Sequence, residues 1–234
     1  MLSIRSILQA IPKKPTLFII EGRYQNWIKP LMLMEELGID RDVICLPGVP
    51  AMKTEWYGKI HPQRMVPALV DELHGEKVTL WDSSSIMLYL TQRYDTERKW
   101  RGRNLAEDIE IWNWLIFETA SLGPTAKYWV SYDLRAEPIP EVTARLHDDL
   151  RKQYDTIEAR LREPGQSYLA LKDRPTIADL SVLLFADSTT SKRMGFQLSE
   201  WPAIKTWSEK MYEFEGVRKA FNEKDNWKAV ELCE

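Results

Sequence analysis

The side chains that could do chemistry in this sequence are few, and most of them stand far apart. The two cysteines, Cys45 and Cys233, form no CxxC pair, and the three histidines stand singly. Neither a dithiol centre nor a metal site is therefore predicted. One polar pair has a suggestive position: Asp82–Ser83 follows an expected strand and opens an expected helix. Because a helix N-terminus attracts anions, this pair can cap the helix, hold a carboxylate, or do both.

Two further patterns stand at the starts of expected elements. Val66–Pro67 precedes a short apolar strand. Its proline is either an ordinary trans residue entering an edge strand or a cis residue in a tight turn, since a cis X–Pro bond costs only about 0.5–1 kcal/mol. Asn26 opens a helix, where its side chain can cap the backbone while its amide nitrogen remains a hydrogen-bond donor.

The elements that must position these residues alternate strand and helix. Expected strands cover 16–20, 43–46, 67–70 and 77–81, and expected helices cover 28–37, 53–59 and 83–93. The last two strands are joined by the turn DELHGE as a hairpin, whereas the earlier pair needs a crossover. The order β-α-β-α-β-β-α predicts a mixed sheet with helical layers, which is the thioredoxin-like arrangement.

Strand signals disappear after the polar segment 95–103 (DTERKWRGR). Helices are expected over 104–130, 140–163, 176–194, 201–215 and 217–222. Thr176 and Asp179 have the spacing of an N-cap and its reciprocal acidic partner. The predicted organisation is an N-terminal extension, 1–15, a thioredoxin-like domain, 16–96, and an all-helical domain, 104–234.

Composition excludes several classes of partner. Thirty-two basic and thirty-five acidic residues leave a formal charge of −3, which argues against a nucleic-acid surface or a polybasic membrane anchor. No apolar run approaches the roughly 18 residues of a membrane span, and the first fifteen residues lack the features of a secretory signal. A cytoplasmic protein without nucleic-acid or membrane partners is predicted. Its ten tryptophans suit helix packing or the lining of an apolar cavity.

Four motifs in this order resemble patterns of the glutathione transferase superfamily, namely N-G-x-K, V-P-A-L, E/D-S and S/T-x-A-D. They are NWIK at 26–29, MVPAL at 65–69, WDSS at 81–84 and TIAD at 176–179. The resemblance runs from Thr16 to about Asn222. It is closest to the nu-class and fungal branch that includes the yeast nitrogen-catabolite regulator, because WLIFE at 114–118 followed by Gly123–Pro124 is similar to a stretch of that branch.

The resemblance implies a cytosolic enzyme that binds glutathione and needs no metal. It places a cis bond at Val66–Pro67, whose backbone meets the cysteinyl part of glutathione as an added strand would. Ser83 and the helix N-terminus would hold the γ-glutamyl carboxylate, and Asp82 the γ-glutamyl ammonium. The Asn26 amide would donate to the sulfur and so favour the thiolate.

Several assignments stay open at this point. The hydroxyl of Tyr24 is an alternative donor to the sulfur, or its ring walls the site. Lys53 and Arg64 are candidates for the glycyl carboxylate, although solvated side chains of this kind are common. The sequence departs from the family pattern at Trp27, where a glycine is usual, and at His61, where an asparagine is usual.

An acceptor pocket is expected between the domains. Its candidate residues are Trp27, Phe117, Ser121 and Tyr128, and the alternative for each aromatic one is helix core. The predicted reaction is addition of the glutathione thiol to an apolar electrophile, which in fungal members often belongs to secondary metabolism. A glutathione-dependent cis–trans isomerase, a disulfide reductase and a non-catalytic regulatory protein are the alternatives. A homodimer is expected, with the helix after Asn104, including Trp112, as a candidate contact.

Overall fold

The chain folds into two units, each with its own architecture. The computed structural model describes residues 11–21, 25–222 and 228–229. One unit comprises residues 97–213, and the other comprises the residues before 97 together with those from 214 onward. The second unit thus ends earlier than the expected helical domain, 104–234, because the last part of the chain returns to the first unit.

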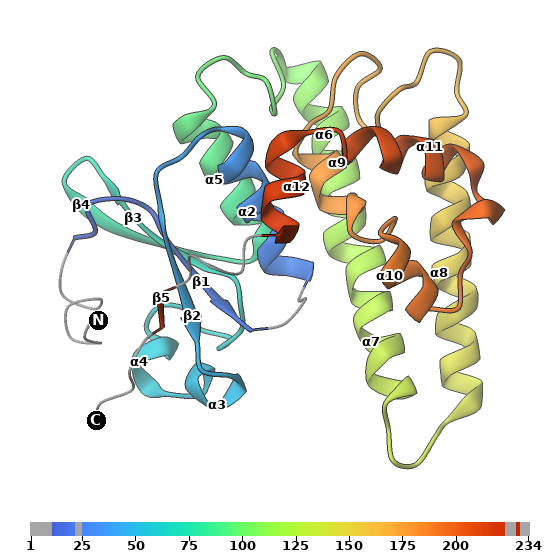
Figure 1. The fold of residues 1–234 in the computed structure, drawn as a ribbon, viewed down its shortest axis with the longest axis horizontal. Coiled ribbons are helices and arrows are strands. Elements are labelled where there is room, and N and C mark those ends of the chain that lie inside the picture. Colours follow the sequence, from blue (N-terminus) through green and yellow to red (C-terminus); the bar gives the residue numbers. More distant parts are fainter. Residues whose placement is uncertain (1–10, 22–24, 223–227, 230–234) are drawn as a thin grey trace. The chain divides into compact units, whose positions relative to one another are not determined.

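The first unit contains a mixed sheet of strand order β4-β3-β1-β2-β5 (Figure 1). Its strands are β1 (Thr16–Ile20), β2 (Asp42–Leu46), β3 (Ala68–Leu73), β4 (Glu76–Trp81) and β5 (Lys228–Ala229). β1 and β2 are parallel, whereas β3 is antiparallel to both β1 and β4. The thioredoxin-like arrangement is confirmed. The two-residue β5, parallel to β2, was not predicted, since so short a strand has no periodicity to detect.

Helices cover this sheet, and the central strand β1 is therefore buried along its whole length. Helix α2 (Gln25–Glu36) packs against α5 (Ser83–Tyr94) and α12 (Glu215–Asn222). The expected helix 53–59 is instead two short helices, α3 (Val49–Met52) and α4 (Glu55–Gly58). Their buried Tyr57 joins a core cluster with Phe18 of β1 and Ile44 of β2.

The C-terminal helix α12 is attached to α2 through a cap far away in the sequence. Glu36, the last residue of α2, accepts hydrogen bonds from the backbone N–H groups of Gly216, at 2.6 Å, and Val217, at 3.3 Å. A side chain at Gly216 would lie 2.6 Å from the backbone nitrogen of Glu36, so only glycine permits this approach. The carboxylate therefore satisfies two of the N–H groups that a helix start leaves unpaired.

The second unit is helical in its described residues. Its elements are α6 (Leu105–Phe117), a π-helical turn (Glu118–Leu122), α7 (Gly123–Asp133), α8 (Pro140–Leu161), α9 (Ile177–Leu183), α10 (Ser188–Arg193), a 3-10 turn (Leu198–Glu200) and α11 (Pro202–Met211). The expected helix 104–130 runs without interruption from α6 through the π turn into α7, whereas the expected helix 176–194 is divided into α9 and α10. At the π turn the buried Glu118 accepts a hydrogen bond from Ser181 of α9 at 2.8 Å.

The segment expected to be a polar connector is, from residue 97, part of the second unit. The Trp100 side chain is 4% exposed, and its carbonyl accepts a hydrogen bond from the Ile177 N–H at 3.0 Å. Arg174 donates to the carbonyl oxygens of Lys99 and Arg101, at 2.9 and 3.0 Å. Charged composition predicted exposure, but these backbone contacts fix the segment on the start of α9.

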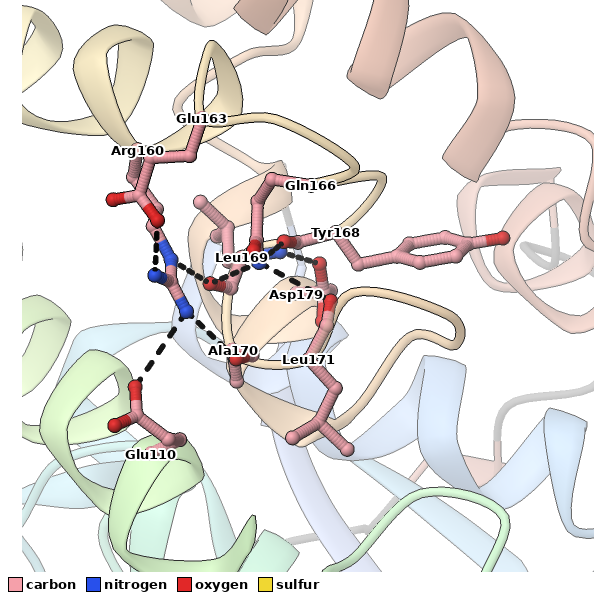
Figure 2. A network of polar contacts seen from close by, with 9 residues as sticks. All are labelled: Glu110, Arg160, Glu163, Gln166, Tyr168, Leu169, Ala170, Leu171 and Asp179. Atoms are coloured by element: carbon pink, nitrogen blue, oxygen red, sulfur yellow. Dashed lines mark hydrogen bonds and ion pairs between the residues drawn. The ribbon is translucent and has the colours of Figure 1, made fainter.

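A buried polar network organises the loop before α9 (Figure 2). The carboxylate of Asp179 accepts from the N–H groups of Leu169, at 2.8 Å, and Thr176, at 2.9 Å, and the predicted capping box is confirmed. Burial raises the pKa of Asp179 to about 6, against the effect of these hydrogen bonds. Arg160 of α8 donates to the carbonyl oxygens of Leu169 and Ala170 and so holds the loop from its other side.

Candidate active site

Three chain segments reach one edge of the sheet because of the strand register. Ala68 of β3 lies opposite Trp81 of β4, so the residues before β3 and after β4 lie at the same edge. Phe18 of β1 lies opposite Ala68, so the end of β1 reaches this edge as well. The edge therefore gathers the residues preceding β3 and the first turns of α2 and α5. These are the segments that carry three of the four sequence motifs.

Asp82 and Ser83 form the N-terminus of α5, as expected. Asp82 Oδ1 accepts hydrogen bonds from the N–H groups of Ser84, at 2.9 Å, and Ser85, at 3.4 Å. Asp82 has a φ of 73°, a strained value for a residue with a side chain, and such strain gathers at functional sites. Ser83 is 5% exposed. The junction thus combines a helix N-terminus, a hydroxyl and a carboxylate, which suits a ligand group that carries both signs of charge.

The Val66–Pro67 bond is cis, as the resemblance implies. Met65, which precedes this bond, is fixed by the core, because the buried Tyr57 hydroxyl donates a hydrogen bond to the Met65 carbonyl at 2.8 Å. Val66 is half-buried against the core cluster that contains Tyr57. The backbone at Val66 is therefore held at the sheet edge by core packing on one side and by β3 on the other.

Asn26 lies in the first turn of α2, which begins at Gln25, so it stands inside the helix and does not precede it as a cap would. Its side chain is exposed, and its Oδ1 accepts a hydrogen bond from Lys29 Nζ at 3.2 Å. The alternative donor, Tyr24, lies outside the described residues. The sequence analysis did not predict this contact with Lys29, although the spacing of three residues from Asn26 puts both side chains on one helix face.

The two candidates for the glycyl carboxylate lie together. Arg64 Nη1 donates to the Lys53 carbonyl at 2.7 Å, and the Lys53 side chain is exposed. Arg64 also has a positive φ of 54°, and its guanidinium lies beside Gly58. The Arg64 side chain therefore ties its loop to α3 and α4, which is a structural use of the guanidinium, while the ammonium of Lys53 faces solvent.

His61 is buried, with 2% exposure, and lies between two aromatic rings. Its ring centroid is 5.6 Å from that of Trp81 and 6.4 Å from that of Tyr57. Burial lowers the pKa of His61, against the opposing effect of the Asp82 charge. Burial therefore favours the neutral form of this side chain, which packs against Trp81 just before the start of α5.

The four acceptor-pocket candidates differ in exposure. Trp27 in the first unit is 3% exposed, whereas Tyr128 in the second unit is 56% exposed. Phe117 is half-buried and packs edge-on against Trp114, with their ring centroids 5.4 Å apart. Ser121 lies in the π turn. A cavity of about 680 Å³ in the second unit is lined by other residues, among them Lys205. That cavity includes none of the residues at the sheet edge.

Two other kinds of feature are absent from the residues that the structure describes. Those residues hold no group of three His, Cys, Asp or Glu side chains able to bind a metal. None of the helices within the same ranges is long and apolar enough to cross a membrane.

Comparison with known proteins identifies the family. The family described as glutathione S-transferase, N-terminal domain, matches residues 28–93, and the corresponding C-terminal domain matches residues 125–215. Glutathione S-transferase verG of Clonostachys rogersoniana is 50% identical over 232 residues, which is 98% of this chain and 97% of that protein. The trimodular acetylaranotin synthesis protein ataIMG of Aspergillus terreus is 37% identical over 193 residues, which is 82% of this chain and 19% of that longer protein.

A solved structure agrees with these matches. The glutathione transferase URE2P6 of Phanerochaete chrysosporium, in complex with oxidized glutathione, is similar with a TM-score of 0.81 and 26% identity, over 90% of this chain and 96% of that one. The folds, the matched domains and the sheet-edge motifs agree with one another. The chain therefore belongs to the glutathione S-transferase family and is an enzyme that uses glutathione.

Proposed function

We propose that the protein joins the sulfur of glutathione to an electrophilic carbon of an apolar small molecule. The observation that carries this proposal is the sheet edge where Val66–Pro67 and Asp82–Ser83 lie, with Asn26 in the first turn of the helix that follows β1. Each segment offers one of the things that glutathione requires: a donor for sulfur, a free backbone edge, and an anion site with a carboxylate beside it.

In the proposed complex, Ser83 and the N-terminus of α5 hold the γ-glutamyl carboxylate. Asp82, whose side chain is exposed although one oxygen caps the helix, meets the γ-glutamyl ammonium. The backbone of Val66 pairs with the cysteinyl residue. Lys53 receives the glycyl carboxylate in preference to Arg64, because the guanidinium already binds a backbone carbonyl.

The chemical step needs only the thiolate. The thiol proton is released to solvent, and the Asn26 amide donates a hydrogen bond to the charged sulfur. The sulfur lone pair then forms the carbon–sulfur bond, and the electrons displaced from the electrophile leave with its leaving group or are protonated. We propose that Phe117 and Tyr128 contact the acceptor, since they are the less buried aromatic candidates.

The acceptor proposed here is an intermediate of natural-product synthesis. This proposal is supported by the similarity to ataIMG, a protein named for acetylaranotin synthesis. We further propose a cytoplasmic homodimer. Mass spectrometry of products separates the reaction types, because conjugation adds glutathione to the acceptor, less any leaving group and its proton, whereas isomerisation leaves the mass unchanged.

The decisive experiment titrates the thiol of bound glutathione through the ultraviolet absorbance of its thiolate. A charge-assisted hydrogen bond contributes about 1.5–3 kcal/mol, so Asn26→Ala should raise the pKa of the bound thiol by about one to two. Its affinity for glutathione at low pH should hardly change, and turnover at neutral pH should fall most. If Asn26→Ala leaves the thiol pKa unchanged while Tyr24→Phe raises it, Tyr24 and not Asn26 is the donor to sulfur. The proposed reaction fails if neither variant changes the thiol pKa and the wild type does not lower it below that of free glutathione.

A further inference from the structure

Lys29 is a charged side chain in an unusual place. It is 1% exposed and ranks among the largest fully buried side chains of the chain. Its neighbours along α2, Ile28, Leu31 and Met32, are buried as well. Because moving an ammonium out of water is costly, an apolar side chain of similar size would be neutral or favourable for folding at this position.

The buried ammonium of Lys29 donates a hydrogen bond to the side chain of Asn26, and this bond fixes the orientation of the Asn26 amide. An ammonium group can only donate, so the Asn26 amide must turn its oxygen toward Lys29 Nζ, 3.2 Å away. The amide NH₂ group then faces away from Lys29, and the Asn26 side chain is exposed at the sheet edge. Without Lys29 the amide could rotate and present its oxygen to the sulfur, which would repel a thiolate.

We propose that Lys29 is a positioning residue that orients the Asn26 amide, with its NH₂ group toward the glutathione sulfur. Its positive charge polarises the same amide and makes it a better donor. This inference rests on the proposed role of Asn26 in holding the thiolate. Lys29 does not touch glutathione in this arrangement, so its effect passes through Asn26.

The test compares Lys29→Met with wild type and with Lys77→Met, a control that removes an exposed lysine from β4. Lys29→Met should raise the pKa of bound glutathione by about one, the lower end of the effect of a neighbouring charge. It should lower kcat at neutral pH and recover as the pH rises, with glutathione affinity at low pH retained. Lys77→Met should leave the thiol pKa and the pH profile unchanged. A lysine that only packs would leave the thiol pKa unchanged as well.

The double variant Asn26→Ala, Lys29→Met separates the inference from the proposal beneath it. If Lys29 acts through Asn26, the double variant has the same thiol pKa as Asn26→Ala alone. A further rise of equal size in the Asn26→Ala background would mean that the charge acts on sulfur directly, and would overturn the positioning role. If Asn26→Ala raises the thiol pKa and Lys29→Met does not, Lys29 has no such role and the proposed function stands. If Asn26→Ala does not change the thiol pKa, the role of Asn26 as donor to sulfur and the positioning role of Lys29 are both wrong.

Discussion

At the scale of single residues, Asp82 serves as the cap of α5 while the neighbouring Ser83 serves as the proposed ligand site. Asp82 already satisfies the N–H groups of Ser84 and Ser85, so α5 does not need the Ser83 hydroxyl as a cap. The hydroxyl is nevertheless at the first position of the helix, where the helix dipole favours a negative group. This arrangement leaves Ser83 available to donate to a carboxylate.

We therefore predict that Ser83→Ala weakens glutathione binding by about 1–3 kcal/mol, the cost of leaving a charged carboxylate short of one donor. The helix N-terminus retains part of the site, so binding should weaken without disappearing. Calorimetric titration with glutathione measures the change. Ser85→Ala is the matched control, because Ser85 lies in the same turn with an exposed side chain. Equal dissociation constants for wild type and Ser83→Ala would remove Ser83 from the site.

The residues that sequence analysis located are those whose role follows from local position. Asp82 was identified because a polar residue between a strand and a helix is a cap in any fold. The contacts of Glu36 were not predictable, since its partners in α12 lie 180 residues further along the chain. Lys29 was passed over because a lysine on an expected helix is ordinarily exposed, and only the tertiary structure reveals its burial.

At the scale of elements, the π turn between α6 and α7 has a physical cause that the hydrophobic pattern does not carry. The apolar periodicity runs on through residues 104–130, so a single helix was expected. In the structure Glu118 is buried, accepts from Ser181 and fills the space beside Gly123. A carboxylate turned into the helical unit requires extra backbone, and the π turn supplies it.

This packing predicts that Gly123→Ala lowers the free energy of unfolding, which is opposite to the usual effect of this substitution within a helix. Alanine in place of glycine within a helix normally stabilises by up to about 1 kcal/mol. Here the new methyl group would lie 2.8 Å from Glu118 Oε1 and 3.1 Å from the Glu118 carbonyl oxygen. We expect a net loss of about 1–3 kcal/mol in the free energy of unfolding, the usual cost of overpacking, measured by urea titration.

The double variant with Glu118→Ala provides the control for this prediction. Removing the carboxylate relieves the closer of the two contacts. The double variant should therefore lose less free energy of unfolding than the sum of the losses in the two single variants. Full additivity, or a Gly123→Ala variant more stable than wild type, would show that the helix accommodates the methyl group without cost.

At the scale of the whole molecule, the sequence predicted the class of each half better than the boundaries between them. The alternation of strand and helix followed by helices alone was sufficient for the thioredoxin-like and helical units. The path of the C-terminal segment was not predictable, because α12 is held by a glutamate in α2 and by a glycine with no room for a side chain. Similarly, the charged composition of 97–103 does not reveal that its carbonyl groups bind Arg174.

An apolar stripe on α6 supports the proposed homodimer. Its four members are among the exposed large hydrophobic residues: Leu105, Ile109, Trp112 and Ile116, which are 65%, 45%, 41% and 61% exposed. Their spacing of four, three and four residues places them within about 60° of one another around the helix axis. A continuous apolar helix face is costly to leave in water, and a second copy of the chain offers an identical face to cover it.

We predict that the wild-type protein sediments as a dimer at micromolar concentration and that Ile116→Glu shifts it to monomer. A glutamate in the stripe would have to be buried unpaired in a symmetric contact, where it would also approach its copy, and both effects oppose association. Asn113→Glu is the matched control, because Asn113 is exposed on α6 outside the stripe and the same charge there should leave the dimer intact. Because the sheet-edge site lies wholly within the first unit, Ile116→Glu should retain its affinity for glutathione. A wild type that is monomeric, or a dimer that withstands Ile116→Glu, would contradict an interface on this face of α6.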